Sequence, residues 1–101
     1  MIQLTKKQEE TIIILAEECS EIIQVCMKIR RFGFNDKNPN DPKAVENWKN
    51  LEQEIGDVVA MIEFVLNLNI GITEKGLKKA YLNKLAKLKK YSKLYDKSES
   101  S

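Results

Sequence analysis

Apolar residues along most of this chain recur three or four positions apart, the spacing of one face of an α-helix. In the first such segment, which begins at about residue 6, they are Ile12, Leu15, Ile22, Val25, Cys26 and Ile29. The rhythm returns in a second segment that runs to Asn69 and in a third from Thr73 to about Leu94. No segment alternates apolar and polar residues as a strand does. The pattern predicts an all-α fold with three main helices.

The polar residues between these segments predict where the helices begin and end. Thr5 followed by Gln8 resembles a capping box at the start of the first helix, and Gly33 is a suitable stop. The stretch from there to about Asp41 is rich in asparagine and predicts a loop. The second helix then begins either at Asp41-Pro42 or near Asn47, and both alternatives stay open.

At 101 residues the chain is expected to form one small helical domain, residues 1–96, followed by a polar tail, residues 97–101. Three helices with broad apolar surfaces are too few to bury one another in a monomer. A helical homo-oligomer, either a homodimer or a homotetramer, is the natural solution.

Composition excludes several kinds of chemistry. A net charge of +2 is too small for a polycation that binds nucleic acid along its whole length, and the absence of histidine removes imidazole-based catalysis. Cys19 and Cys26 are seven residues apart on one predicted helix, too far for a disulfide, and we expect reduced thiols in or near the core of a cytoplasmic protein. The apolar run 12–16 is too short to span a membrane, so no membrane partner is expected.

Two pairs of acids interrupt the apolar stripes. Glu18 and Glu21 are three residues apart, as are Glu54 and Asp57, so each pair points to nearly one side of its helix. The residues four positions after these acids are apolar, and no lysine or arginine there pairs with them. Unpaired carboxylates in an apolar seam are costly unless they take up protons or hold a cation. The alternative is a solvated acidic face; the pattern favours a site for a hard divalent ion, Mg²⁺ above all.

These motifs resemble a known family. Glu-Glu-x-x-Glu on one helix and Glu-x-x-Asp on the next are similar to the MazG-like all-α nucleoside triphosphate pyrophosphohydrolases. Residues 15–24 (LAEECSEIIQ), 31–33 (RFG) and 50–58 (NLEQEIGDV) resemble the small phage-type members in particular. The likeness covers about residues 10 to 65 well and the last helix loosely.

The resemblance implies an antiparallel helical bundle of three main helices that is completed by a second subunit. It also implies a Mg²⁺ site, with Mn²⁺ as the alternative ion, and cleavage of a nucleoside or deoxynucleoside triphosphate into the monophosphate and pyrophosphate. The implied metal ligands are Glu18, Glu21, Glu54 and Asp57. Glu17 matches the extra acid of the motif and is implied as a further ligand or as the base that positions water. These five carboxylates are therefore the expected catalytic residues. A role in cleansing the nucleotide pool follows from the same resemblance.

Further residues are candidates for contacting the substrate. They are Lys28, Arg31, Trp48, Lys79, Asn83, Lys84 and Lys87. The cations suit a triphosphate, although helix-end cations and a solvated lysine face are the simpler interpretations. Trp48, with Phe32 and Phe34, suits stacking on a base, although aromatic residues near helix ends more often plug a core.

The nine lysines from Lys75 to Lys97 support an alternative of another class: a non-catalytic helical module that binds DNA or another protein through its last helix. Within the enzyme interpretation, a preference for deoxyuridine triphosphate or for alarmone nucleotides is the runner-up. A nucleoside triphosphate is the expected partner, and nucleic acid is not. Base and sugar are left open.

Overall fold

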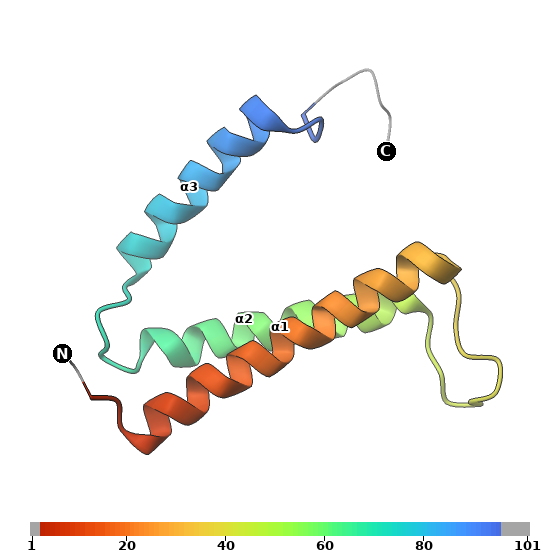
Figure 1. The fold of residues 1–101 in the computed structure, drawn as a ribbon, viewed down its shortest axis with the longest axis horizontal. Helices are drawn as coiled ribbons and strands as arrows, with labels where there is room; N and C mark the ends of the chain where they lie inside the picture. The colour runs from red at the N-terminus through yellow and green to blue at the C-terminus, as the bar shows by residue number, and fades with distance from the viewer. Residues whose placement is uncertain (1–2, 96–101) are drawn as a thin grey trace. The chain divides into compact units, whose positions relative to one another are not determined.

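The computed structural model describes residues 3–95, and within that range it contains three helices and no strand (Figure 1). The helices are α1 (Lys6–Phe32), α2 (Asn47–Leu66) and α3 (Glu74–Tyr91). The predicted all-α fold is confirmed. The chain divides into two compact units, residues 1–68 and 69–101, and each is described by itself.

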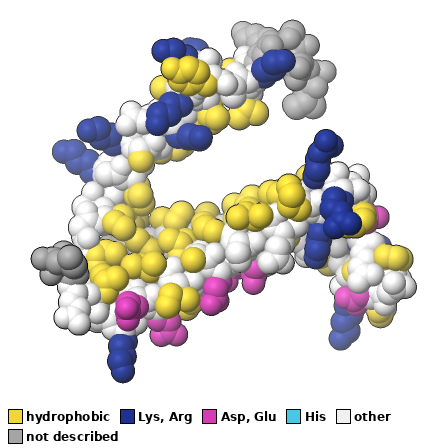
Figure 2. Space-filling view, in the orientation of Figure 1, with side chains coloured by type: hydrophobic (Ala, Val, Ile, Leu, Met, Phe, Trp, Pro, Cys, Tyr) yellow, Lys and Arg dark blue, Asp and Glu magenta, His cyan; other side chains and the backbone are white. Residues whose placement is uncertain are grey.

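The first unit is a helical hairpin in which α1 and α2 pack side by side in opposite directions (Figure 1). The beginning of α1 lies next to the residues that follow α2. There the Gln8 side-chain amide donates a hydrogen bond of 2.8 Å to the carbonyl of Leu68. The buried apolar residues are few: Val25, Val65 and Leu68. Figure 2 shows a broad apolar surface along the hairpin. The predicted homo-oligomer, which this surface would suit, stays a prediction.

The ends of α1 lie where the sequence placed them. The Thr5 hydroxyl accepts a hydrogen bond from the Gln8 backbone, and the Gln8 side chain accepts one from the Thr5 backbone, so the predicted capping box is confirmed. Gly33 follows the last residue of α1 with φ at 111°, a conformation that favours glycine. The predicted stop is therefore confirmed as well.

Of the two predicted starts for α2, Asn47 is right and Asp41-Pro42 is wrong. The Asp41 carboxylate caps only a turn, by accepting a hydrogen bond of 2.9 Å from the backbone of Lys43. Asn47 is instead fixed by the loop before it: its backbone N–H donates to the carbonyl of Asp36 at 2.8 Å, and its side-chain amide donates to that of Gly33 at 2.9 Å.

The ends of α2 and α3 correct two further expectations. α2 ends at Leu66 and not at Asn69, which lies in the left-handed region with φ at 57°. In the second unit the Thr73 hydroxyl accepts a hydrogen bond of 3.0 Å from the backbone of Gly76, as its predicted role as a cap requires. α3 ends at Tyr91, short of the predicted limit, because the backbone of Ser92 leaves the helical conformation.

Three further expectations concern the cysteines, the membrane and the domain bounds. Cys19 and Cys26 are free thiols as predicted, but both are exposed, so their predicted place in or near the core is wrong. Among the described residues, no helix combines the length and apolar character needed to cross a membrane. The single domain over residues 1–96 stays a prediction, and the tail 97–101 lies outside the described residues.

Candidate metal centre and active site

Three of the predicted acids converge between α1 and α2. Glu18 and Glu21 lie one turn apart on α1, and Glu54 faces them from α2. One carboxylate oxygen of each lies within 4.8 Å of the others. We call these three residues the acidic cluster. The helical spacing and the packing of the hairpin together bring the acids to one place, as the sequence predicted for them.

Two oxygens of the acidic cluster are shielded from water. One carboxylate oxygen of Glu18 and one of Glu54 are buried, and neither has a hydrogen-bond partner among the described residues. Polar atoms in proteins rarely stay unpaired when they are buried, because each loses its hydration without replacement. These two oxygens therefore need a ligand or a proton.

The acids of the site alter each other's ionisation. The pKa of Glu54 is raised from its ordinary 4.5 to about 7, first because its protonated carboxyl can donate a hydrogen bond to Glu21 and then because it is partly desolvated. The negative charges of Glu21, Asp57 and Glu18 add to this rise. The pKa of Glu18 is also raised, first by desolvation and then by the charges of Glu21 and Asp57. Both carboxyls therefore keep a proton more readily than an isolated glutamate does.

The other two predicted acids lie beside the acidic cluster. Asp57 is half-buried, and its charge acts on both Glu18 and Glu54, although it is not one of the three residues with converging oxygens. One Asp57 oxygen accepts a hydrogen bond of 2.9 Å from the side-chain amide of Gln53. Glu17 is exposed, and its charge contributes to the raised pKa of Glu18.

The acidic cluster fits a hard divalent cation. It offers only oxygen donors, it holds unpaired buried oxygens, and its carboxylates repel one another in the absence of a positive charge. Mg²⁺ and Mn²⁺ prefer such donors, whereas softer ions prefer sulfur or imidazole. A cation placed here would relieve both the repulsion and the loss of hydration.

The predicted substrate-binding residues are more scattered. Lys28 lines a pocket described below, and the Arg31 guanidinium lies 4.8 Å from the centre of the Phe32 ring. The Trp48 indole N–H donates a hydrogen bond of 2.6 Å to the carboxylate of Glu46, and its ring stacks on Phe34 with centroids 6.4 Å apart. The remaining candidates are exposed on α3, in the second unit: Lys79, Asn83, Lys84 and Lys87.

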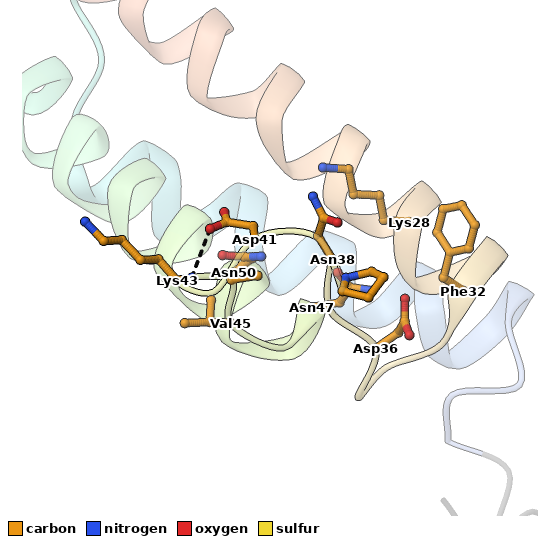
Figure 3. A pocket seen from close by; sticks show the side chains of 11 residues that line it. Lys28, Phe32, Asp36, Asn38, Asp41, Lys43, Val45, Asn47 and Asn50 are labelled. Atoms are coloured by element: carbon orange, nitrogen blue, oxygen red, sulfur yellow. Dashed lines mark hydrogen bonds between the residues drawn. The ribbon is translucent and has the colours of Figure 1, made fainter.

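The hairpin also contains a pocket that the sequence did not reveal. Its volume is about 620 Å³, and it lies between the end of α1, the loop and the start of α2 (Figure 3). Besides Lys28, its polar lining consists of Asp36, Asn38, Asp41, Lys43, Asn47 and Asn50. One signal in the sequence pointed here: Asn50 precedes Glu54 by four residues, so both lie on one side of α2.

Comparison with known proteins agrees with this geometry. The family model of the MazG nucleotide pyrophosphohydrolase domain matches residues 6–92, which include all three helices and the acidic cluster. The chain belongs to the MazG nucleotide pyrophosphohydrolase family. Searches of curated proteins and of solved structures returned no match.

Proposed function

We propose that this protein is a Mg²⁺-dependent pyrophosphohydrolase that cleaves nucleoside or deoxynucleoside triphosphates into the monophosphate and pyrophosphate. The observation that carries the proposal is the acidic cluster: three carboxylates from two helices, with two buried oxygens that have no partner among the described residues. Membership of the MazG family gives the class of bond that is cleaved. A role in cleansing the nucleotide pool suits this activity.

Glu18, Glu21 and Glu54 are proposed to hold the ion, and Asp57 is proposed to complete the set from the next turn of α2. A divalent ion in such a site neutralises charge on the phosphates and increases the acidity of water. Mg²⁺ is the proposed ion and Mn²⁺ the alternative, because hard oxygen donors suit both.

The chain's own residues supply the rest of the chemistry. Glu17 is exposed next to the acidic cluster, so it is available to orient a water molecule and accept its proton. Lys28 and Arg31 lie further along α1 and are proposed to offset the negative charge of the phosphates. The α3 candidates are proposed to do so across a subunit boundary. The reaction needs no covalent nucleophile, and water serves in that role.

Assembly into a homodimer or homotetramer forms part of the proposal. Large apolar side chains are exposed along both helices of the hairpin, among them Ile23, Met27, Val59 and Phe64, each more than half exposed. Burying such side chains gains roughly 1.5–3 kcal/mol each. Sedimentation analysis of the full chain tests this part, and a monomer at all concentrations would refute it.

The activity is tested with a panel of canonical and modified triphosphates, with pyrophosphate and orthophosphate resolved. We expect pyrophosphate release that requires Mg²⁺, stops with a chelator and returns when Mg²⁺ is restored. Glu54→Gln should abolish turnover, whereas Glu52→Gln, an exposed change on α2, should not. Release of orthophosphate alone would contradict cleavage between the α- and β-phosphorus. DNA binding that survives chelation and weakens steeply with salt would favour the lysine-rich module instead.

A further inference from the structure

The pocket beside the acidic cluster has the position and chemistry of a second half of the substrate site. We propose that it binds the nucleoside of the substrate, and that the amides of Asn50 and Asn38 make hydrogen bonds to it. This inference rests on the proposed function, because it assigns the other end of the same triphosphate. Nothing in the family match specifies where the base and sugar bind.

The first argument is position. On α2, Asn50 precedes Glu54 by one turn, about 6 Å along the axis, on the same side of the helix. On α1, Lys28 follows Glu21 by seven residues, two turns and about 10 Å, again on the same side. Because the two helices run in opposite directions, both steps lead from the acidic cluster toward the loop. A nucleotide with its phosphates at the acids can therefore extend its nucleoside into the pocket.

The second argument is charge. The pocket is lined by two lysines, Lys28 and Lys43, and by two aspartates, Asp36 and Asp41. Its lining is thus neutral overall, which suits an uncharged nucleoside better than a free polyanion. A volume of about 620 Å³ is that of a small-molecule site and is larger than a phosphate group requires.

The third argument is hydrogen bonding. The Asn47 amide donates to the carbonyl of Gly33, and the Asn38 side-chain oxygen accepts from the backbone of Asn40, so both groups are partly committed to holding the loop. The Asn38 amide nitrogen and the whole Asn50 amide have no hydrogen bond within the described residues. An asparagine amide offers a donor and an acceptor, which match the edge of a nucleobase or the hydroxyls of a sugar.

The pocket also has an apolar wall suited to a flat ring. Phe32 and Pro39 line it together with Val45, and Figure 3 shows Phe32 on α1 and Val45 before α2. Trp48 is not part of the lining; its indole N–H and ring are occupied by Glu46 and Phe34. Because Phe32 lines the pocket and Trp48 does not, contact with the base is assigned to Phe32.

The inference is tested by measuring the two ends of the substrate separately. The probes are pyrophosphate and the nucleoside monophosphate that corresponds to the best triphosphate substrate, both titrated calorimetrically with Mg²⁺. Asn50→Ala and Asn38→Ala should each raise the dissociation constant of the monophosphate roughly tenfold, which is the effect of about one lost hydrogen bond. Both variants should leave the affinity for pyrophosphate unchanged. KM for the triphosphate should rise by a similar factor. Glu52→Gln is the matched control on α2.

A second readout needs neither metal nor turnover. Titrating the ¹⁵N-labelled protein with the free nucleoside in the presence of a chelator should shift the side-chain amide signals of Asn50 and Asn38. Wild-type hydrolysis combined with unchanged monophosphate affinity and KM in both variants would overturn the nucleoside pocket and leave the proposed function standing. Absence of Mg²⁺-dependent hydrolysis of any triphosphate by the wild type would refute the proposed function itself. Asn50→Ala removes no intrachain side-chain hydrogen bond of the described residues, so loss of fold does not obscure the result.

Discussion

Replacing Glu54 with glutamine should make the metal-free protein more stable, and only above about pH 5. The pKa of Glu54 is raised in the folded protein from 4.5 to about 7, so the folded state holds a proton that the unfolded state has released between these values. The free energy of unfolding therefore falls as the pH rises through this window. Glutamine resembles the protonated carboxyl and cannot ionise, so in Glu54→Gln the free energy of unfolding should not fall in this way as the pH rises.

The magnitude follows from the same values. The difference between 4.5 and about 7, at about 1.4 kcal/mol per pH unit, sets an upper limit of about 3.4 kcal/mol at pH 8. Glu54 is only partly buried, and solvent screening reduces such an effect, so we expect about 1 kcal/mol. At pH 4.5 the variant and the wild type should have nearly equal free energies of unfolding.

The assay is urea denaturation of chelator-treated protein at pH 4.5, 6 and 8, at one fixed protein concentration. Glu52→Gln serves as the control, because it removes an exposed carboxylate of α2 that is not part of the acidic cluster. Adding Mg²⁺ at pH 8 should then stabilise the wild type, by about 1.4 kcal/mol at ten times its dissociation constant, and should hardly affect Glu54→Gln. Wild-type and variant stabilities that differ by the same amount at every pH would refute the reasoning.

Four further substitutions test the hairpin. Thr5→Ala should lower the free energy of unfolding by about 1 kcal/mol, because it removes the cap of α1; circular dichroism during urea denaturation measures this, and an unchanged midpoint would contradict it. Gly33→Ala should destabilise by about 1 kcal/mol through strain at φ 111°, whereas Gly56→Ala, where an added Cβ meets nothing within 4 Å, should stabilise a monomer by up to about 1 kcal/mol. A destabilised Gly56→Ala would instead reveal a close partner. Gln53→Ala should weaken the Mg²⁺-induced rise in melting temperature by loosening Asp57, and an unchanged rise would exclude that role.

Local signals in the sequence were enough to place both ends of α1. The start of α1 depends on Thr5 and Gln8, which contact each other within one turn, and the stop at Gly33 depends on the conformation of a single residue. The start of α2 was ambiguous for the opposite reason. Asn47 is selected by its hydrogen bonds to Gly33 and Asp36, and contacts over that range depend on how the loop folds.

The candidate site, too, could be predicted from the sequence only in part. Convergence of Glu18, Glu21 and Glu54 was predictable, because helical spacing gives each acid its side and an apolar seam indicates which sides meet. Helix spacing does not give the offset between two packed helices, so it could not show that Asp57 would lie outside the converging three. The volume and the lining of the pocket could not be predicted from the sequence, because a loop forms one of its walls.

The two ends of the proposed substrate site differ in their electrostatic requirements. This difference predicts which part of the substrate needs the metal ion in order to bind. The acidic cluster repels a triphosphate until a cation has compensated its charge, because like charges at this separation interact strongly in a partly desolvated site. The pocket at the loop is neutral in its lining and makes no such demand. A nucleoside should therefore bind with or without Mg²⁺, whereas pyrophosphate should require the ion. If pyrophosphate bound equally well to the chelator-treated protein, the phosphates would have to lie away from the acidic cluster. That result would refute the assignment of the phosphates to the acidic cluster and of the nucleoside to the pocket.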